Sequence, residues 1–119
     1  MHIRKGDVEA GTSNVVTCQL SVVNLSSYIF FDYSATHSFI STIHANRLDR
    51  AKYIILRTFR TSLPFGDVLI LTHWLRAIPV RVLERELYMD LIILDMYDYD
   101  VILGMDFLTK YNATIECRP

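Results

Sequence analysis

Hydrophobic and polar positions alternate over short segments along most of the chain, and this pattern predicts a mostly β protein. The apolar segments are rich in β-branched and aromatic residues and are separated by turn-forming residues, which is typical of strands. Proline lacks an amide hydrogen, so Pro79 is expected at a sheet edge or in an irregular stretch. The predicted strands are 15–23, 28–31, 53–56, 68–71, 77–82, 87–94, 101–103 and 113–117.

Two further segments carry apolar residues at roughly helical spacing, which predicts two short helices. The first is expected over 38–47, with Ser38 or Thr36 able to cap its start. The second is expected over 105–111. Between them, the segment 63–67 (Leu-Pro-Phe-Gly-Asp) is the strongest turn signal in the chain.

The length of the chain limits its organisation. Its 119 residues suffice for one compact domain and are too few for two ordinary ones, and a hydrophobic content of 51% argues against disorder throughout. Polar residues and glycines at the start predict a flexible leader over 1–13, followed by one domain over 14–119. A domain of this size has little room for a deep active site, so an enzyme built on it gains a cleft most easily by pairing two copies.

Composition also argues against several classes of function. Twelve Lys and Arg residues against thirteen Asp and Glu residues leave a net charge of -1, which does not provide the basic face that phosphate binding requires, so we expect no nucleic-acid partner. No apolar run is long enough for a membrane span, and the start of the chain lacks the apolar core of a secretory signal. Two cysteines without metal-ligand spacing predict neither a disulfide scaffold nor a metal site. We therefore expect an intracellular, most simply cytoplasmic, protein with no membrane partner, metal or cofactor.

Two segments interrupt the apolar pattern at places where chemistry could lie. Asp32 follows an apolar strand directly, and a carboxylate that is partly desolvated at a strand end can act as a general acid or base. An aspartate in this position is also a common turn former. Gly104 stands between a strand and a predicted helix, where either a close backbone approach or a simple tight turn requires glycine. When each segment is considered alone, a structural turn is sufficient to explain why Asp32 and Gly104 stand there.

Taken together, the two segments resemble one protein family. The segment Phe31-Asp-Tyr-Ser-Ala-Thr-His-Ser-Phe-Ile-Ser41 is similar to the active-site segment of retropepsin-type aspartic proteases, in the form found in gypsy-class retrotransposon polyproteins. The segment from Leu91 to Leu108 resembles the family's C-terminal signature, an apolar strand, Leu-Gly and a short helix. The resemblance runs from about Val15 to Cys117 and is weaker in the middle. It implies a mostly β, retropepsin-like closed barrel with one or two short helices.

The resemblance further implies peptide-bond hydrolysis by a homodimer that acts on an extended polypeptide, such as a polyprotein. Asp32 of each subunit would supply one of two carboxylates that share a proton, one activating a water and the other polarising the scissile carbonyl. No cofactor or metal takes part in this chemistry. The residues implied to form the site are the catalytic Asp32, the active-site loop residues Tyr33, Ser34, Ala35 and Thr36, the flap residues Phe65, Gly66 and Asp67, and Gly104 as a structural turn.

The sequence departs from the family pattern directly after Asp32. Where the family has Ser or Thr followed by Gly, this chain has Tyr33 and Ser34. A tyrosine ring does not place its hydroxyl where a serine does, and Ser34 adds a Cβ where the family has none. Two functions therefore stay open: an aspartic endopeptidase impaired by these residues, or a catalytically inactive module of the same fold, used for dimerisation or peptide binding, from a degraded or domesticated retroelement.

Other residues that often carry chemistry have simpler explanations here. His37 lies close to Asp32 in the sequence and is expected to be a loop histidine without a catalytic role. Trp74 is expected to pack beneath the flap. The acidic residues from Asp95 to Asp106 lack the ligand spacing and the glycine of an EF-hand, so they predict a solvated turn.

Overall fold

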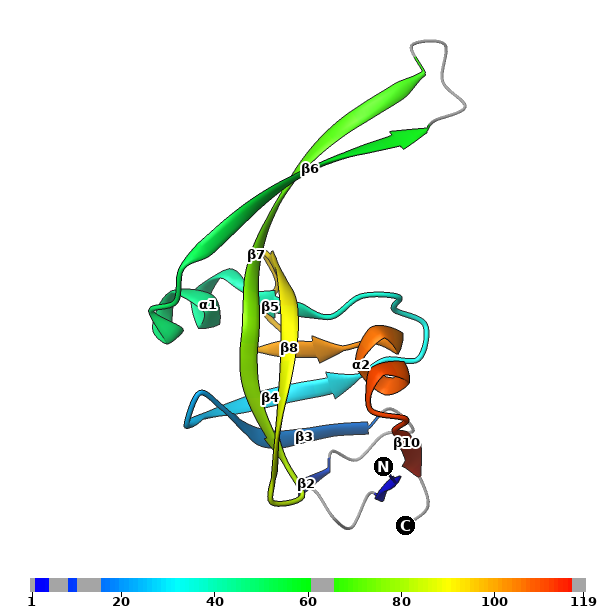
Figure 1. The fold of residues 1–119 in the computed structure, drawn as a ribbon. Coiled ribbons are helices and arrows are strands. Elements are labelled where there is room, and N and C mark those ends of the chain that lie inside the picture. The colour runs from blue at the N-terminus through cyan, green and yellow to red at the C-terminus, as the bar shows by residue number, and fades with distance from the viewer. Residues whose placement is uncertain (1, 5–8, 11–15, 61–65, 117–119) are drawn as a thin grey trace.

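The computed structural model describes residues 2–4, 9–10, 16–60 and 66–116 of the chain. Over these residues the protein is mostly β with two short helices, which confirms the predicted fold class (Figure 1). The strands are β1 (His2–Arg4), β2 (Glu9–Ala10), β3 (Val16–Val22), β4 (Leu25–Phe31), β5 (Phe39–Ser41), β6 (Lys52–Arg60), β7 (Asp67–Val82), β8 (Arg85–Leu94), β9 (Val101–Leu103) and β10 (Thr114–Glu116), and the helices are α1 (Thr42–Leu48) and α2 (Met105–Lys110).

Six strands form a closed barrel. The main sheet has the order β2-β3-β4-β9-β5-β8-β7-β6, and an additional pairing of β3 with β7 joins the second strand from one end to the second strand from the other. The ring is therefore β3-β4-β9-β5-β8-β7, and β2 and β6 lie outside it. Ser21 opposite Arg81 and Val22 opposite Val80 make the closing pairs. Closure leaves these six strands with few free edges, as barrels do.

The interior of the barrel is filled mainly by aliphatic side chains, which in the longer strands alternate with exposed ones. In β8, Leu87, Met89 and Leu91 are buried and the residues between them are exposed, as the period of two of a half-buried strand requires. Helix α2 adds Phe107 to this core, where its ring lies 6.2 Å from that of Phe31 at the end of β4. The end of β4, which carries the predicted site, is thus anchored in the core.

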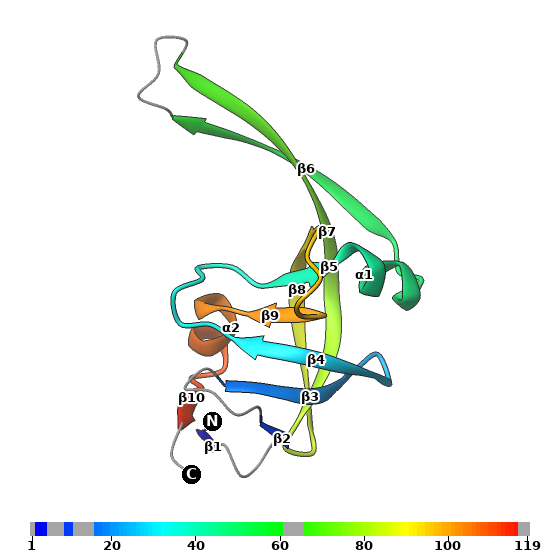
Figure 2. The same ribbon diagram turned by 180° about the vertical axis from the view of Figure 1, so that it is seen from behind.

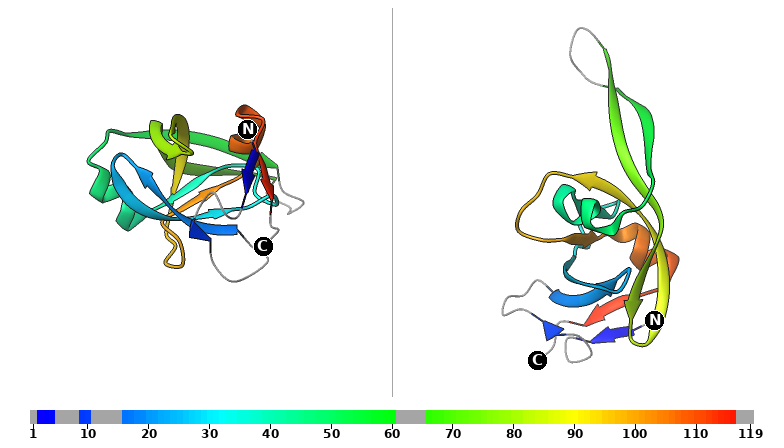
Figure 3. Two further views of the ribbon diagram at one scale, coloured as in Figure 1. Left: turned by 90° about the horizontal axis from the view of Figure 1, so that it is seen from below. Right: turned by 90° about the vertical axis from the view of Figure 1, so that its left-hand side faces the viewer.

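The hairpin of β6 and β7 extends away from the barrel (Figures 1 and 3). Its outer part contains only these two strands, whereas the second half of β7 returns into the barrel beside β8. The predicted strands 68–71 and 77–82 are therefore parts of one long strand, with a bulge between Leu75 and Ile78. Pro79 lies next to this bulge, in agreement with the irregular stretch expected there.

The first predicted helix begins later than expected. Phe39 and Ile40 belong to β5, which pairs with both β8 and β9, so pairing within the barrel overrides the helical spacing of these residues. Helix α1 starts at Thr42, and its cap is Ser41, whose hydroxyl accepts a hydrogen bond from the amide of His44 (3.1 Å). The prediction that Ser38 or Thr36 caps a helix is therefore wrong.

The two ends of the chain meet beside the barrel. Strand β1 pairs in parallel with β10, and β2 pairs with β3. These pairings place strands inside the segment 1–13, which the sequence predicted as a flexible leader. The partner of β1 lies more than 100 positions away and leaves no local signal. The division of the chain after residue 13 stays a prediction. Neither helix in the described part of the chain is long and apolar enough to cross a membrane.

Candidate active site

Asp32 lies where β4 ends and the chain turns. Its amide donates a hydrogen bond to the carbonyl of Leu103 on β9 (2.9 Å), and its own carbonyl accepts one from the amide of Ala35 (3.3 Å). Its partly buried carboxylate accepts two hydrogen bonds at Oδ1, from the amide (2.9 Å) and the hydroxyl (2.5 Å) of Ser34. An aspartate that binds the amide two residues ahead is a common turn former, so this turn serves a structural purpose as well as any chemical one.

Parallel pairing brings together the two segments that the sequence singled out. In the β4–β9 pair, Phe31 lies opposite Leu103. Because parallel strands run in the same direction, the next residues of both strands, Asp32 and Gly104, emerge at the same edge of the sheet. Figure 2 shows β4 and β9 side by side, with the loop after β4 passing close to the start of α2.

Gly104 allows a close approach between these two segments. A Cβ at this position would lie 2.6 Å from the carbonyl oxygen of Ala35 and closer still to that of His37. The amide of Met105 donates to the same Ala35 carbonyl (2.7 Å), and the amide of Gly104 donates to the hydroxyl of Ser38 (3.0 Å). The loop after Asp32 is thus held directly against the residues that precede α2, and only glycine leaves room for it.

The buried Ser38 and the half-buried Asp106 fix this arrangement through hydrogen bonds. The Ser38 hydroxyl donates to Asp106 Oδ1 (2.6 Å) while it accepts from Gly104, and the Ser38 amide donates to Asp106 Oδ2 (3.0 Å). Asp106 Oδ1 also accepts from the amide of Phe107 in the first turn of α2 (2.8 Å). The prediction that the acidic residues form a solvated turn is therefore wrong for Asp106. The sequence does not single out this pair. It shows only that a serine and an aspartate lie in the two segments that resemble the family.

The residues that differ from the family pattern both lie in the turn. The side chain of Tyr33 is 50% exposed. Ser34 directs its hydroxyl to its own Asp32, and its φ is not positive, so its Cβ introduces no left-handed backbone strain. Thr36 lies further along the loop, where its hydroxyl is 2.9 Å from Nδ1 of His37.

Comparison with protein families assigns the whole chain. Residues 1–119 match the family model described as retroviral aspartyl protease. The chain belongs to this family. No curated protein matches it in sequence.

Solved structures of this and related groups share the fold of the retroviral aspartyl protease described here. EIAV protease complexed with the inhibitor HBY-793 is 22% identical with a TM-score of 0.63, covering 87% of this chain and 97% of its own. The retroviral protease-like domain of Ddi1 from Leishmania major is 13% identical with a TM-score of 0.59, covering 86% and 77%. Lpg0085 from Legionella pneumophila, a protein of unknown function (DUF785), is 12% identical with a TM-score of 0.53, covering 84% and 88%. These similarities establish the retropepsin fold.

The hairpin of β6 and β7 carries the described residues that the resemblance assigned to a flap. Of the residues that the resemblance assigned to it, Gly66 has a φ of 74°, which favours glycine, and Asp67 begins β7 opposite Arg60. Phe65 lies outside the described residues. Gly66 and Asp67 stand at the outer end of the hairpin, which extends away from the barrel (Figure 3).

An apolar cavity of about 480 Å³ lies between the active-site loop and the base of this hairpin. Trp74 on β7 is 8% exposed and donates from Nε1 to the hydroxyl of Thr72 (2.8 Å), which agrees with the packing expected for it beneath the flap. Its ring meets that of His37 edge-on, with centroids 6.3 Å apart. The cavity is lined by Thr36, His37, Phe39, Ile70, Leu71, Thr72, His73, Trp74, Ile92, Ile93 and Leu94. Its volume is in the range that holds small ligands or side chains.

His44 is a buried titratable group on α1. The hydroxyl of Ser27 donates to the carbonyl of Leu25 (2.9 Å), so the His44 Nε2, 2.6 Å from that hydroxyl, is the donor of their hydrogen bond. Burial lowers the pKa of His44 below 6.5, against the opposing effect of Asp100, whose Oδ1 lies 3.8 Å from Nδ1. Among the residues that the structure describes, no three His, Cys, Asp or Glu side chains are grouped to hold a metal ion.

Proposed function

We propose that this chain is an aspartic endopeptidase domain whose active site forms from two copies, each supplying Asp32. The observation that carries the proposal is the fixed turn at the end of β4, in a chain that belongs to the retroviral aspartyl protease family. Within the described residues, only Oδ1 of Asp32 accepts hydrogen bonds, from Ser34. Oδ2 is therefore available to a water molecule or to the carboxyl group of a second Asp32.

The proposed chemistry follows from two carboxyl groups held close together. They do not both ionise easily, so they share one proton and titrate as a pair. The first carboxyl group, which is ionised, takes a proton from a water molecule while the water oxygen attacks the scissile carbonyl carbon. The second, which is protonated, gives its proton to the carbonyl oxygen. When the resulting diol collapses, the C–N bond breaks, the first carboxyl passes to the nitrogen the proton that came from the water, and a diol hydroxyl returns its proton to the second carboxylate, so that the pair again shares one proton. No covalent intermediate with the protein forms.

The pairing of the chain ends supports assembly from two copies. One chain supplies one Asp32 turn, so a pair of carboxylates requires a second chain. Within the described part of the chain, β1 and β10 pair only with each other, and each keeps an edge whose backbone groups can pair with a second copy.

The proposed substrate is an extended polypeptide that binds as an added strand between the β6–β7 hairpin and the floor that carries Asp32. The cavity beneath the hairpin supports this choice because apolar side chains line most of it. We further propose an origin in a gypsy-class retrotransposon polyprotein, supported by the motifs over 31–41 and 91–108. An intracellular polyprotein would be the natural substrate.

A second function is favoured by Tyr33, whose ring stands where the family has a small hydroxyl residue. In this alternative, the chain keeps the fold and binds peptides or dimerises without cleaving. Its fold is shared with Lpg0085, whose function is unknown. The endopeptidase function requires that Ser34 alone holds the Asp32 carboxylate in a position for catalysis. The binding function does not require this.

Cleavage of a peptide library distinguishes the two functions. The purified chain is incubated with apolar-rich peptides at acidic pH, and products are identified by mass spectrometry. The endopeptidase proposal expects cleavage by the wild type and none by Asp32→Asn. If the wild type cleaves nothing while the double variant Tyr33→Ser with Ser34→Gly cleaves, the wild-type chain is the inactive module.

A further inference from the structure

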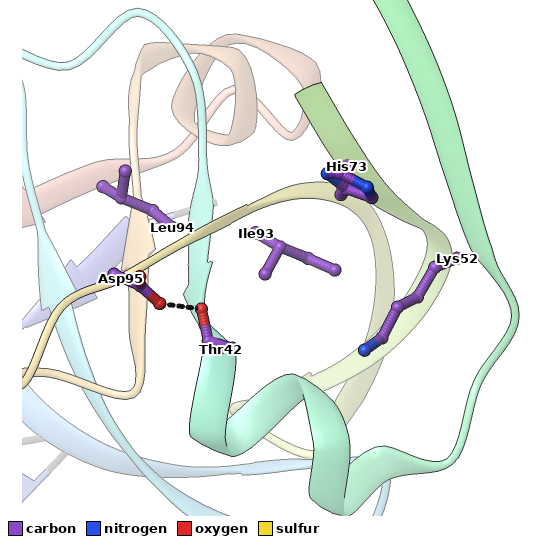
Figure 4. A pocket seen from close by; sticks show the side chains of 6 residues that line it. All are labelled: Thr42, Lys52, His73, Ile93, Leu94 and Asp95. Atoms are coloured by element: carbon purple, nitrogen blue, oxygen red, sulfur yellow. Dashed lines mark hydrogen bonds between the residues drawn. The ribbon is translucent and has the colours of Figure 1, made fainter. Parts of the chain in front are cut away.

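A second cavity continues the one beneath the hairpin. It has a volume of about 440 Å³ and lies beside the start of α1 (Figure 4). The two cavities share His73, Ile93 and Leu94 in their linings. The two cavities therefore adjoin at the end of β8 and are together called the groove; the inner one lies against the loop after Asp32 and the outer one against α1. The outer cavity adds Thr42, Lys52 and Asp95 to the shared residues.

The outer cavity has a cationic end and an anionic end. In Figure 4, Lys52 and His73 lie on one side and Asp95 on the other, with Ile93 between them. The Asp95 carboxylate already accepts a hydrogen bond from the hydroxyl of Thr42. The Lys52 ammonium donates to the amide oxygen of Asn46 (2.6 Å), and no carboxylate in the described part of the chain pairs with it.

These charges favour one kind of side chain. An ammonium group has three donors, so Lys52 retains donors for a ligand after it binds Asn46. A carboxylate entering the groove is attracted to Lys52 and repelled by Asp95 at the opposite end, which gives it one orientation. Charge complementarity of this kind contributes more to specificity between ligands than to the affinity of any one ligand.

We propose that the outer cavity is a distal subsite that binds an acidic side chain of the extended polypeptide, several residues from the scissile bond. The inference rests on the proposed function only in that the same polypeptide occupies the cleft at Asp32. Successive side chains of an extended strand point to opposite sides, so only every second residue of the substrate can face the groove. Lys52 is then a specificity-determining residue that makes no contact with the reacting atoms.

Peptide binding tests this subsite separately from cleavage. Fluorescein-labelled, apolar-rich peptides carry a single Glu at successive positions, and each is compared with the same peptide carrying Gln or Lys there. Their dissociation constants are measured by anisotropy on the Asp32→Asn variant, which leaves the peptides intact. We expect one position, or two positions separated by one residue, at which Glu binds about threefold to fivefold more tightly than Lys, the range of an exposed ion pair.

Charge reversal identifies the residue responsible. Lys52→Glu in the same background is expected to invert the preference to Lys at that position, and Lys52→Met is expected to abolish it. Arg85→Glu is the matched control, because Arg85 is exposed at the far tip of the β7–β8 hairpin and lines neither cavity. Circular dichroism confirms that each variant is folded.

The outcomes separate the two proposals. A Glu scan without a preferred position, no peptide binding at all, or a preference that Lys52→Glu leaves unchanged overturns the distal subsite, whether or not the wild type cleaves. A preference that inverts in Lys52→Glu supports the subsite even if the wild-type chain cleaves no peptide, in which case only the endopeptidase proposal fails.

Discussion

The hydroxyl of Ser34 donates a hydrogen bond of 2.5 Å to Oδ1 of Asp32, the oxygen that also accepts the amide of Ser34. In the family pattern, a Ser or Thr follows the aspartate and a Gly comes next. Here the hydroxyl stands one position later and binds the carboxylate of its own chain. Ser34 is therefore a positioning residue for Asp32.

Removal of this hydroxyl is expected to reduce kcat more than it changes KM. In Ser34→Ala the carboxylate keeps the amide bond but loses the hydroxyl bond, and misplacement by about 1 Å costs on the order of 100-fold in rate. We expect kcat to fall by about 10-fold or more, with Ser34→Thr recovering most of it. Initial rates on a cleaved peptide give both constants. Equal kcat in wild type and Ser34→Ala would show that the hydroxyl does not position Asp32.

Gly104→Ala is expected to destabilise the fold strongly. The added Cβ meets the backbone carbonyls of Ala35 and His37, which cannot rotate away, so the loop after Asp32 must move. Overpacking of this kind costs about 1–3 kcal/mol or more of unfolding free energy, measured by urea denaturation.

Gly66→Ala is the matched control for this measurement. Its Cβ meets no atom within 4 Å, so only the positive φ of 74° is penalised. That penalty is about 1 kcal/mol. An equal loss of stability in both variants would contradict the close approach at Gly104.

Ser38→Ala is expected to cost about 1–3 kcal/mol of unfolding free energy, because it leaves the Gly104 amide and one bond of the Asp106 carboxylate without a partner in a buried site. Thermal or urea unfolding measures the loss. Ser26→Ala, at an exposed position of β4, is the control and is expected to be nearly neutral. Similar stabilities for the two variants would argue that the Ser38–Asp106 pair does not hold the segments together.

Stability is expected to fall in acid through His44. Its pKa is lowered by burial in the folded state, so the unfolded chain binds the proton more readily. The stabilisation is present above the unfolded pKa of about 6.5 and is lost as the pH falls through the lower folded pKa. Urea unfolding over a pH series is expected to show a shallower acid slope for His44→Gln than for the wild type. Parallel slopes would contradict the assignment.

The sequence predicted, through the resemblance to one family, that Asp32 and Gly104 belong to one site, and it located most strands. It did not predict that Phe39 and Ile40 form a strand, because β5 exists only through its pairing with β8 and β9. Nor did it join 68–71 with 77–82, since a bulge interrupts the alternation without ending the strand.

Contacts between distant residues were the least predictable. Ser38 and Asp106 are 68 positions apart, and nothing local to either residue indicates the other. The hydrogen bond between Ser34 and Asp32 is local, yet from the sequence alone Ser34 was only a residue that adds a Cβ where the family has none. The ordinary backbone conformation of Ser34 became apparent only from its dihedral angle.

Mixing wild-type and Asp32→Asn chains tests the shared active site most directly. The two are combined at constant total concentration, subunits are allowed to exchange, and peptide cleavage is measured as a function of the wild-type fraction. Because a dimer with one Asp32 lacks the second carboxylate, activity is expected to follow the square of that fraction, so an equal mixture retains about a quarter of the wild-type rate. A linear dependence, with half the rate retained, would contradict a site built from two copies of Asp32.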